Sequence, residues 1–488
     1  MISKEFFKSS LVYSVVGALP LAASVLLLPF YTNLLSTADF GRLALYISFS
    51  FLIQILVSFG LDSYITVQYI EFKSDPALLR ENMSAITTSF LVISAVFTLL
   101  SLFTGPVLFS LFFRDGSLSF YPWGFLSVLT AVFHGAFKLY TNLLIYQQRP
   151  GRYFWVNIIN FLLVIGISLG GLYLFPRSLV GPMWGRLLSA LALAAFSIHF
   201  LLRSYGVARG RAFVKGMVSY CSPLVIYSLL FWVLSYVDRF VINHFMRAED
   251  VAVYDFAVKC TLLIEFFQTG LVSAIYPKVF GIWKEQKVPE SSVQVNRYFN
   301  GFSAATLLVL PLFLMVVPAL VPLVVHEEAY YAGFKFLPLL SLGFIGRTLF
   351  YMFLAPFYYF RKTRLLPRVL LFSSLLQLLL SVWFVKRWGL AGAVWINFIM
   401  KWVVAGFAFN ECRKIFKFKF NRIKLIWLPL VYTLIFILAG RAAGPDDALL
   451  VYFGEALVSL ALVVFVYRRE LLLLLEQWRR KSRLSTAG

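Results

Sequence analysis

Two short stretches of the sequence decide how the chain is organised: Leu179-Val-Gly-Pro-Met-Trp184 and Leu390-Ala-Gly-Ala-Val-Trp395, at an offset of 395 − 184 = 211 residues. Each carries a glycine and a tryptophan at the same two places and opens an apolar run. The same offset brings Ala38-Asp-Phe-Gly41 onto Glu249-Asp-Val-Ala252. Self-similarity at a fixed period is typical of repeated architectures, so we expect two homologous halves. The alternative is coincidence among leucine-rich helices.

The composition places these halves in a membrane. Of the 488 residues, 60% are hydrophobic and only 14% are charged, whereas soluble domains carry about 25% charged residues. An ordinary water-soluble enzyme is therefore excluded. The net charge of +22 would suggest nucleic acid as the partner of a soluble protein, but here the charges cluster in short loops between apolar runs.

The apolar runs predict about fourteen membrane-spanning helices, because a hydrocarbon core about 30 Å thick needs roughly 20 apolar residues per helix. The predicted spans are 11–35, 40–64, 83–104, 120–146, 154–175, 179–202, 219–245, 250–276, 299–325, 332–360, 365–385, 389–410, 425–440 and 448–467. The fold class is thus an all-α polytopic membrane protein, with two homologous six-helix lobes around a central cavity and two further C-terminal helices. Repeats with an even number of spans share one orientation, which is typical of transporters that rock about a central site.

The predicted domain limits follow from this pattern. The N-terminal six-helix lobe covers 1–205, the C-terminal lobe 206–412, helices 13 and 14 lie within 413–467, and a basic amphipathic tail covers 468–488. Of the 44 lysines and arginines, 30 fall in one set of loops and tails and eight in the other. The positive-inside rule makes the first set cytoplasmic, so both termini are expected in the cytoplasm and the tail on the cytoplasmic leaflet.

The remaining basic residues lie inside the spans and are the best candidates for a binding site. They are Lys138, Arg186, Arg239, Lys259, Arg347 and Lys401. Ionisable groups at membrane depth are costly unless they face a bundle interior or water. The acids inside the spans of the two lobes are Asp62, Asp238, Asp255 and Glu265. These four are too few to neutralise six cations. The surplus predicts an anionic substrate, for which arginine offers paired hydrogen bonds and lysine a mobile point charge.

Several of these residues have structural alternatives. Asp238 and Arg239 could form a structural pair or snorkel from a helix end, and Lys259 could pair with Asp255 one helical turn away. Asp62 and Glu265 are candidates for coupling to Na+ or H+, since a partly desolvated carboxylate can be neutralised by either. Salt bridges to nearby basic residues are the alternative for both.

Enzymatic chemistry has no support in the sequence. The chain has neither GxSxG, the Walker GxxxxGK[ST] pattern nor HExxH, and no connecting segment exceeds about 25 residues. We therefore expect no catalytic residues, no metal site, no cofactor and no nucleic-acid partner.

The chain resembles the polysaccharide-transporter, O-antigen flippase-like branch of the superfamily that also holds multidrug-and-toxin extrusion exporters and lipid II flippases. The resemblance covers about residues 1–440 and rests on Leu35-Ser-Thr-Ala-Asp-Phe-Gly-Arg-Leu-Ala44, Tyr236-Val-Asp-Arg-Phe-Val-Ile242 and Glu249-Asp-Val-Ala-Val-Tyr-Asp-Phe-Ala257. It implies transport of an undecaprenyl-pyrophosphate-linked oligosaccharide across the bacterial inner membrane by alternating access.

The resemblance also implies partners, which are membrane lipids and the polymerase and glycosyltransferases that make the glycan. Two other members of the superfamily remain as alternatives, a lipid II-type flippase and a cation or drug exporter. A lipid II flippase should have an arginine-rich first span, and this chain has no charge between Lys8 and Asp39. A drug exporter should have a negative rather than a basic cavity. A glycan polymerase or glycosyltransferase would need a long outer loop with catalytic residues.

Overall fold

The computed structural model describes residues 16–17, 19–113, 118–207, 214–285, 288–360, 362, 365–415, 419–442 and 448–468. The start of the first predicted span, 11–15, and the predicted tail beyond residue 468 lie outside these residues. Throughout the described part the secondary structure is helical. Contacts divide the chain into a first unit, Met1–Lys259 with Val325–Tyr331, and a second unit, Cys260–Val324 with Ala332–Gly488.

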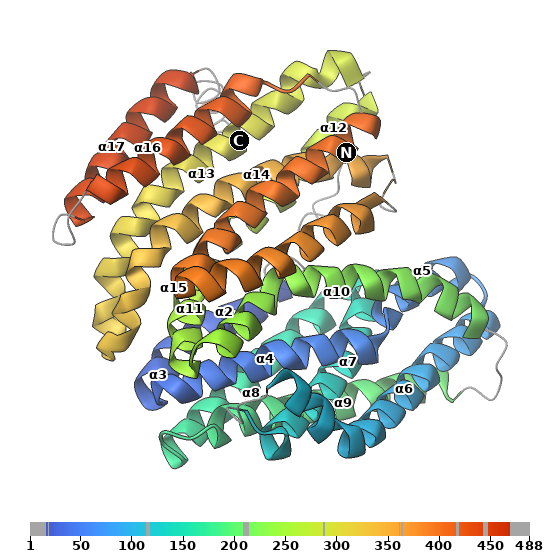
Figure 1. Cartoon of the computed structure of the whole chain (residues 1–488). Coiled ribbons are helices and arrows are strands. Elements are labelled where there is room, and N and C mark those ends of the chain that lie inside the picture. The colour runs from blue at the N-terminus through green and yellow to red at the C-terminus, as the bar shows by residue number, and fades with distance from the viewer. Residues whose placement is uncertain are drawn as a thin grey trace, which may run out of the picture. The chain divides into compact units, whose positions relative to one another are not determined.

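The first unit is a bundle of long and short helices (Figure 1). Its elements are α2 (Leu19–Leu26), α3 (Leu28–Leu34), α4 (Thr37–Ser58), α5 (Leu61–Phe72), α6 (Pro76–Phe112), the π-helical turn η1 (Phe120–Gly124), α7 (Phe125–Tyr146), α8 (Pro150–Leu174), α9 (Val180–Tyr205), α10 (Val214–Phe245) and α11 (Ala248–Cys260). Helix α10 belongs to this unit because the buried indole of Trp232 donates a hydrogen bond of 2.9 Å to the carbonyl of Ser48 in α4.

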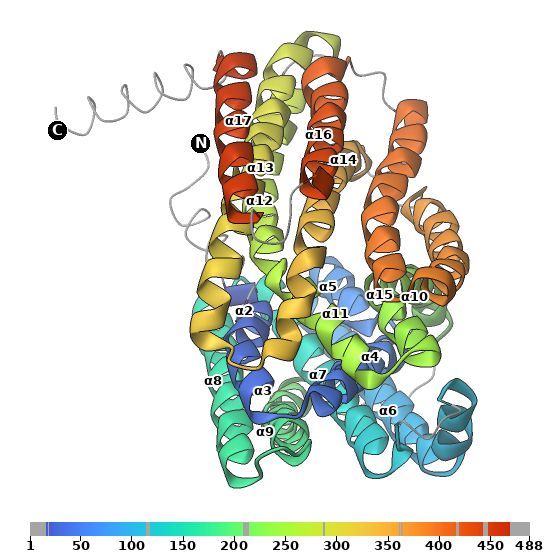
Figure 2. The same ribbon diagram turned by 60° about the vertical axis from the view of Figure 1, so that its left-hand side comes forward.

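The second unit holds the remaining helices. They are α12 (Leu262–Glu285), α13 (Val288–Val324), the 3-10 segment η2 (Glu328–Phe336), α14 (Leu337–Tyr359), α15 (Leu366–Ile415), the π-helical turn η4 (Ile423–Trp427), α16 (Leu428–Ala442) and α17 (Ala448–Val466). Helix α17 packs along α13, and α14 packs along α15 (Figure 2). The first four residues of η2 count with the first unit.

The predicted number of spans is confirmed for the described residues. Ten helices are long and apolar enough to cross a membrane, and three shorter apolar helices cover 22–34, 423–438 and 452–466. Helix α15 contains two predicted spans, because Gly389 breaks it with a left-handed φ of 57°. Counted as two, α15 brings the total to fourteen.

A second break in a predicted span determines the position of Asp62, one of the candidate acids. Phe59 and Gly60 take left-handed φ values of 47° and 72° between α4 and α5, a conformation that glycine adopts without steric penalty. The break begins a new helix at Leu61, which puts Asp62 in its first turn. A single predicted span, 40–64, is therefore two helices that meet at the position of a buried charge.

The paired glycines of the repeat allow close packing of helices in each half. A Cβ on Gly181 at the start of α9 would overlap the backbone of α8 around Gly171, and one on Gly392 would overlap the backbone of Phe384. Each glycine thus lets a helix lie close against the one before it in the chain. The lobe boundary at 205/206 stays a prediction, since units defined by contacts need not coincide with repeats.

Candidate functional site

In the first unit, one buried carboxylate binds two cations. Asp255 of α11 accepts from Arg239 Nε at 2.7 Å and lies 2.8 Å from Lys259 Nζ. The predicted pairing of Lys259 with Asp255 is present, as the spacing of four residues suggested. The neighbouring Asp238 accepts a hydrogen bond of 2.9 Å from the hydroxyl of Tyr254.

A second pair in this unit is neutral overall. Lys138 of α7 lies 2.9 Å from Asp62 of α5, and the amide of Asn142 donates to the Asp62 carbonyl at 3.1 Å. The carboxylate is buried while the lysine side chain is 52% exposed. The ammonium group of Lys138 therefore neutralises the buried carboxylate, while about half of the lysine side chain stays exposed.

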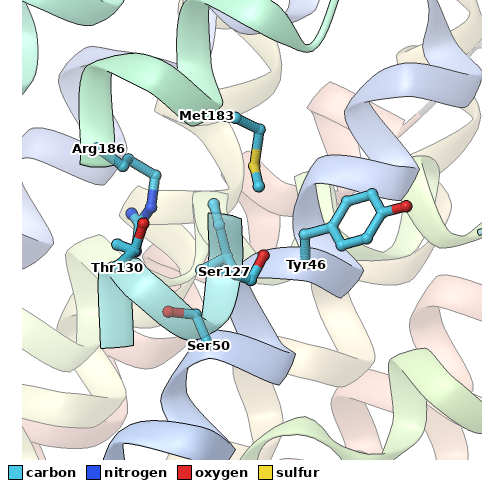
Figure 3. A pocket seen from close by; sticks show the side chains of 7 residues that line it. Tyr46, Ser50, Ser127, Thr130, Met183 and Arg186 are labelled. Atoms are coloured by element: carbon cyan, nitrogen blue, oxygen red, sulfur yellow. The ribbon is translucent and has the colours of Figure 1, made fainter. Parts of the chain in front are cut away.

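Arg186 of α9 differs from the other basic residues. It lines a narrow pocket with Tyr46, Ile47, Ser50, Ser127, Thr130 and Met183, into which no water-sized sphere fits. Figure 3 shows its guanidinium reaching toward Thr130, among hydroxyl groups. Within the described part of the chain, no carboxylate lies within ion-pair distance of Arg186. The other six residues that line this pocket are all uncharged.

The second unit holds a cluster of two cations and one carboxylate, formed by the first turn of α12 and the middle of α14 together with the part of α15 that follows Gly389. Arg347 of α14 lies 2.7 Å from Glu265 of α12, and its guanidinium also donates to the hydroxyl of Tyr351 at 2.9 Å. The ammonium of Lys401 in α15 lies 4.0 Å from the centre of the Phe344 ring. We call these five residues the Arg347 cluster.

Packing makes room for the lysine of this cluster. A Cβ on Gly343 would come within 2.7 Å of Lys401 Cδ, and one on Gly346 within 3.1 Å of the Lys401 carbonyl. Only the absence of these side chains allows α15 to lay Lys401 across α14. The ring of Phe344 faces both cations, since the Arg347 Cζ lies 5.6 Å from its centre, and cations are attracted to aromatic faces at such distances.

Behind the cluster, a buried polar network ties three helices together. The amide nitrogen of Gln268 in α12 donates to the carbonyl of Phe344 and to the hydroxyl of Thr348, both at 2.8 Å. The hydroxyl of Thr306 in α13 lies 3.0 Å from that of Thr348. The amide oxygen of Gln268 is buried and has no hydrogen-bond partner among the described residues, so the network links the three helices through the amide nitrogen and the two hydroxyls.

The comparisons with known proteins give the family. A model of a family described as polysaccharide biosynthesis protein matches residues 6–283. The chain belongs to this family. No curated protein sequence matches it significantly.

Solved structures show that this polysaccharide biosynthesis protein shares its fold with membrane transporters. A structure of the lipid II flippase MurJ in an inward closed conformation matches with a TM-score of 0.75 and 12% identity, over 95% of this chain and all of that one. An outward-facing multidrug resistance MATE family transporter of the MOP superfamily matches with a TM-score of 0.58 and 17% identity, over 83% of this chain and 95% of that one. A MOP superfamily transporter from Pyrococcus furiosus, whose title describes a reversed polarity of the binding pocket, gives 0.56 and 15% over the same shares.

For this family member, sequence reasoning found the charges but missed the residues that organise them. Tyr351 follows Arg347 by four residues on the same helix, a spacing that brings side chains together, so the sequence carried that signal. No sequence signal pointed to Gly343 and Phe344, because their role depends on Lys401 approaching from another helix. The six predicted basic residues form separate groups within the two units: Lys138 with Asp62, Arg239 and Lys259 with Asp255, and Arg347 and Lys401 near Glu265. Arg186 has no ion pair with any described carboxylate.

Proposed function

We propose that this protein is a flippase that moves an undecaprenyl-pyrophosphate-linked oligosaccharide, an O-antigen unit or a similar polysaccharide repeat, across the bacterial inner membrane by alternating access. Three findings support the proposal: the family described as polysaccharide biosynthesis, the fold shared with a lipid II flippase over 95% of the chain, and the surplus of cations at membrane depth. The positive-inside pattern supports cytoplasmic termini for this multi-pass protein.

The observation that carries the proposal is the Arg347 cluster. Arg347 forms an ion pair with Glu265, and both Arg347 and Lys401 face the ring of Phe344 in a bundle of apolar helices. One side of the Arg347 guanidinium donates to Glu265 and Tyr351. Lys401 has a long, flexible side chain. A pyrophosphate could displace Glu265 from the arginine and draw in the lysine, because guanidinium binds phosphate through parallel hydrogen bonds and ammonium acts as a point charge.

The other cations are ranked by their partners. Arg186, with no carboxylate in reach among the described residues, comes next, and its narrow pocket would have to widen to admit phosphate or sugar. Lys138 follows, since it is half-exposed. Arg239 and Lys259 come last because both already contact the buried Asp255.

Coupling to an ion gradient has two candidate sites. Protonation of Glu265, or Na+ binding to it, would release Arg347 for substrate, and the same event at Asp62 would release Lys138. In this scheme the ion replaces the basic residue at the carboxylate, and the pyrophosphate replaces the carboxylate at the basic residue. Each carboxylate therefore links ion binding to substrate binding.

The proposal is tested in proteoliposomes that contain the purified full chain and a fluorescent undecaprenyl-pyrophosphate-linked oligosaccharide. We expect wild type to move the lipid to the other leaflet, and Arg347→Ala or Lys401→Ala to reduce the rate at least about tenfold, which corresponds to roughly 1.4 kcal/mol of lost substrate stabilisation. Lys386→Ala, at an exposed lysine on α15, is the matched control and should transport normally.

Lipid II serves as the second substrate in the same vesicles, because MurJ shares the fold over nearly the whole chain. Transport of lipid II alone would replace the proposed substrate with the lipid II alternative. Normal transport by both Arg347→Ala and Lys401→Ala would remove the cluster from the site.

A further inference from the structure

A cleft of about 390 Å³ lies in the first unit, and none of the charged residues of the candidate functional site lines it. Three segments far apart in the sequence form it: the first turns of α4, the residues around η1, and the loop between α8 and α9. Its lining residues are Asp39, Arg42, Tyr46, Ser119, Trp123, Arg177, Ser178 and Leu179. The volume falls in the range of about 300–1,000 Å³ that is usual for small-molecule sites.

Local structure fixes the polar groups of this cleft. Ser36 caps α4 and donates a hydrogen bond of 2.8 Å to Asp39, which in turn lies 3.0 Å from Arg42 Nη1. The Nε of Arg42 is buried and has no hydrogen-bond partner among the described residues. The Arg42 side chain as a whole is 42% exposed and lines the cleft, so a ligand in the cleft can reach the part of the guanidinium that Asp39 does not occupy.

The second arginine is held by an unusual backbone. Arg177 has a φ of 55° and its N–H donates to the carbonyl of Leu34 at 2.9 Å. Left-handed backbone at a residue other than glycine is strained and tends to occur at functional sites. The hydrogen bond to Leu34 holds this loop conformation, which leaves an exposed guanidinium on the rim of the cleft.

The floor is rigid and partly aromatic. The buried hydroxyl of Tyr46 donates to the Ser119 carbonyl at 2.9 Å and accepts from the Ser119 N–H at 3.0 Å, which ties α4 to the segment that enters η1. Trp123 follows in η1 and is half-buried. Its indole offers the cleft a broad apolar face with a polar edge.

We propose that this cleft binds an acidic sugar, a pyranose ring that carries a carboxylate. The indole of Trp123 would pack against the apolar C–H face of the ring, while Arg42 and Arg177 would hold the carboxylate, for which the guanidinium fork is well matched. Two guanidiniums against the single carboxylate of Asp39 leave one positive charge for the ligand. Asp39 would accept hydrogen bonds from the ring hydroxyls, and the serine hydroxyls would donate or accept them.

The place of the cleft suggests when this sugar would bind. The loops that form it are those the positive-inside rule puts on the outer face, where a glycan arrives after translocation. This assignment rests on the proposed function for the source of the sugar, whereas binding itself needs no transport. Tyr46 lines both this cleft and the Arg186 pocket, so the cleft lies next to a candidate cation of the same unit.

The test measures binding of a soluble oligosaccharide to the purified full chain in non-ionic detergent, by titration calorimetry and saturation-transfer NMR. The probe is a tetrasaccharide of alternating glucuronate and N-acetylglucosamine, and its carboxyl-reduced form is the neutral control. We expect the acidic form to bind at least about tenfold more tightly. Trp123→Ala and Arg177→Asn should each weaken its binding at least about fivefold. Asparagine is chosen because it tolerates left-handed backbone.

Matched variants control for general effects. Trp155→Ala and Arg203→Ala replace an exposed tryptophan on α8 and an exposed arginine at the far end of α9, and both should bind like wild type. Equal affinity for the acidic and neutral forms, or unchanged binding by both Trp123→Ala and Arg177→Asn, would overturn the proposal. So would binding of phosphatidylglycerol in mixed micelles at this cleft without any binding of the tetrasaccharide, which would assign it to a lipid headgroup.

The flippase assay is run on the same preparations. Acidic-sugar binding without any translocation would contradict the proposed function and leave the cleft intact. Translocation without tetrasaccharide binding would contradict the acidic-sugar site and leave the proposed function intact. The two proposals can therefore fail separately.

Discussion

The Asp255 site of the first unit and the Arg347 cluster of the second have the same charges, two cations and one carboxylate, but they differ in access. The Asp255 side chain is 3% exposed and contacts both cations directly. The Glu265 side chain is 28% exposed and its ion pair is with Arg347, while Lys401 lies over an aromatic ring. A closed site of this kind holds helices together, whereas an open one can exchange its carboxylate for a ligand. Charge count alone does not distinguish the two.

The largest effect should come from removing the carboxylate of the closed site. Asp255→Asn leaves Arg239 and Lys259 without an anion, and breaking a buried pair from one side costs about 3–5 kcal/mol. We expect low yield and a large fall in the unfolding midpoint in detergent. Glu411→Gln, in the exposed pair with Lys414, is the control and should change stability by at most about 1 kcal/mol. Equal midpoints for the two variants would show that Asp255 does not hold the helices together.

The matching substitution in the open site should cost less stability and change function more. Glu265→Gln removes a charged hydrogen bond that is partly exposed, worth about 1–2 kcal/mol, and Arg347 keeps its contact with Tyr351. If Glu265 couples transport to Na+ or H+, the variant should move lipid-linked oligosaccharide at a rate independent of the ion gradient. Transport that still follows the gradient would assign coupling elsewhere, with Asp62 as the next candidate.

A smaller change tests the position of Lys401 without touching a charge. Gly343→Ala puts a methyl group 2.7 Å from Lys401 Cδ, so the lysine must move away from Phe344. We expect transport to fall about threefold, under 1 kcal/mol, with little change in stability because alanine favours the helix by about 1 kcal/mol. Gly406→Ala on α15, where a Cβ meets nothing within 4 Å, is the control. Transport by Gly343→Ala at the control's rate would separate Lys401 from the site.

The sequence could predict the features that depend on local pattern. The fourteen spans follow from hydropathy along the chain, and the pairing of Lys259 with Asp255 follows from their spacing on one helix. Arg347 and Glu265 are 82 residues apart, so no pattern in the sequence connects them. The same holds for the outer cleft, where Arg177 lies in a predicted loop and Trp123 at the start of the predicted span 120–146. Both gain a role only when three segments far apart in the sequence converge.

The smallest effect is expected at the remaining pair, which combines features of both sites. Asp62 is buried like Asp255, but Lys138 is 52% exposed, so water screens most of their attraction. A double-mutant cycle of Asp62→Asn and Lys138→Gln, measured as unfolding in mixed micelles, should give a coupling energy of about 0.2–1 kcal/mol. A coupling near 3 kcal/mol would mean that Lys138 is buried when the protein is in the membrane. The pair would then resemble the closed Asp255 site, and Asp62 would no longer be a candidate site for the coupling ion.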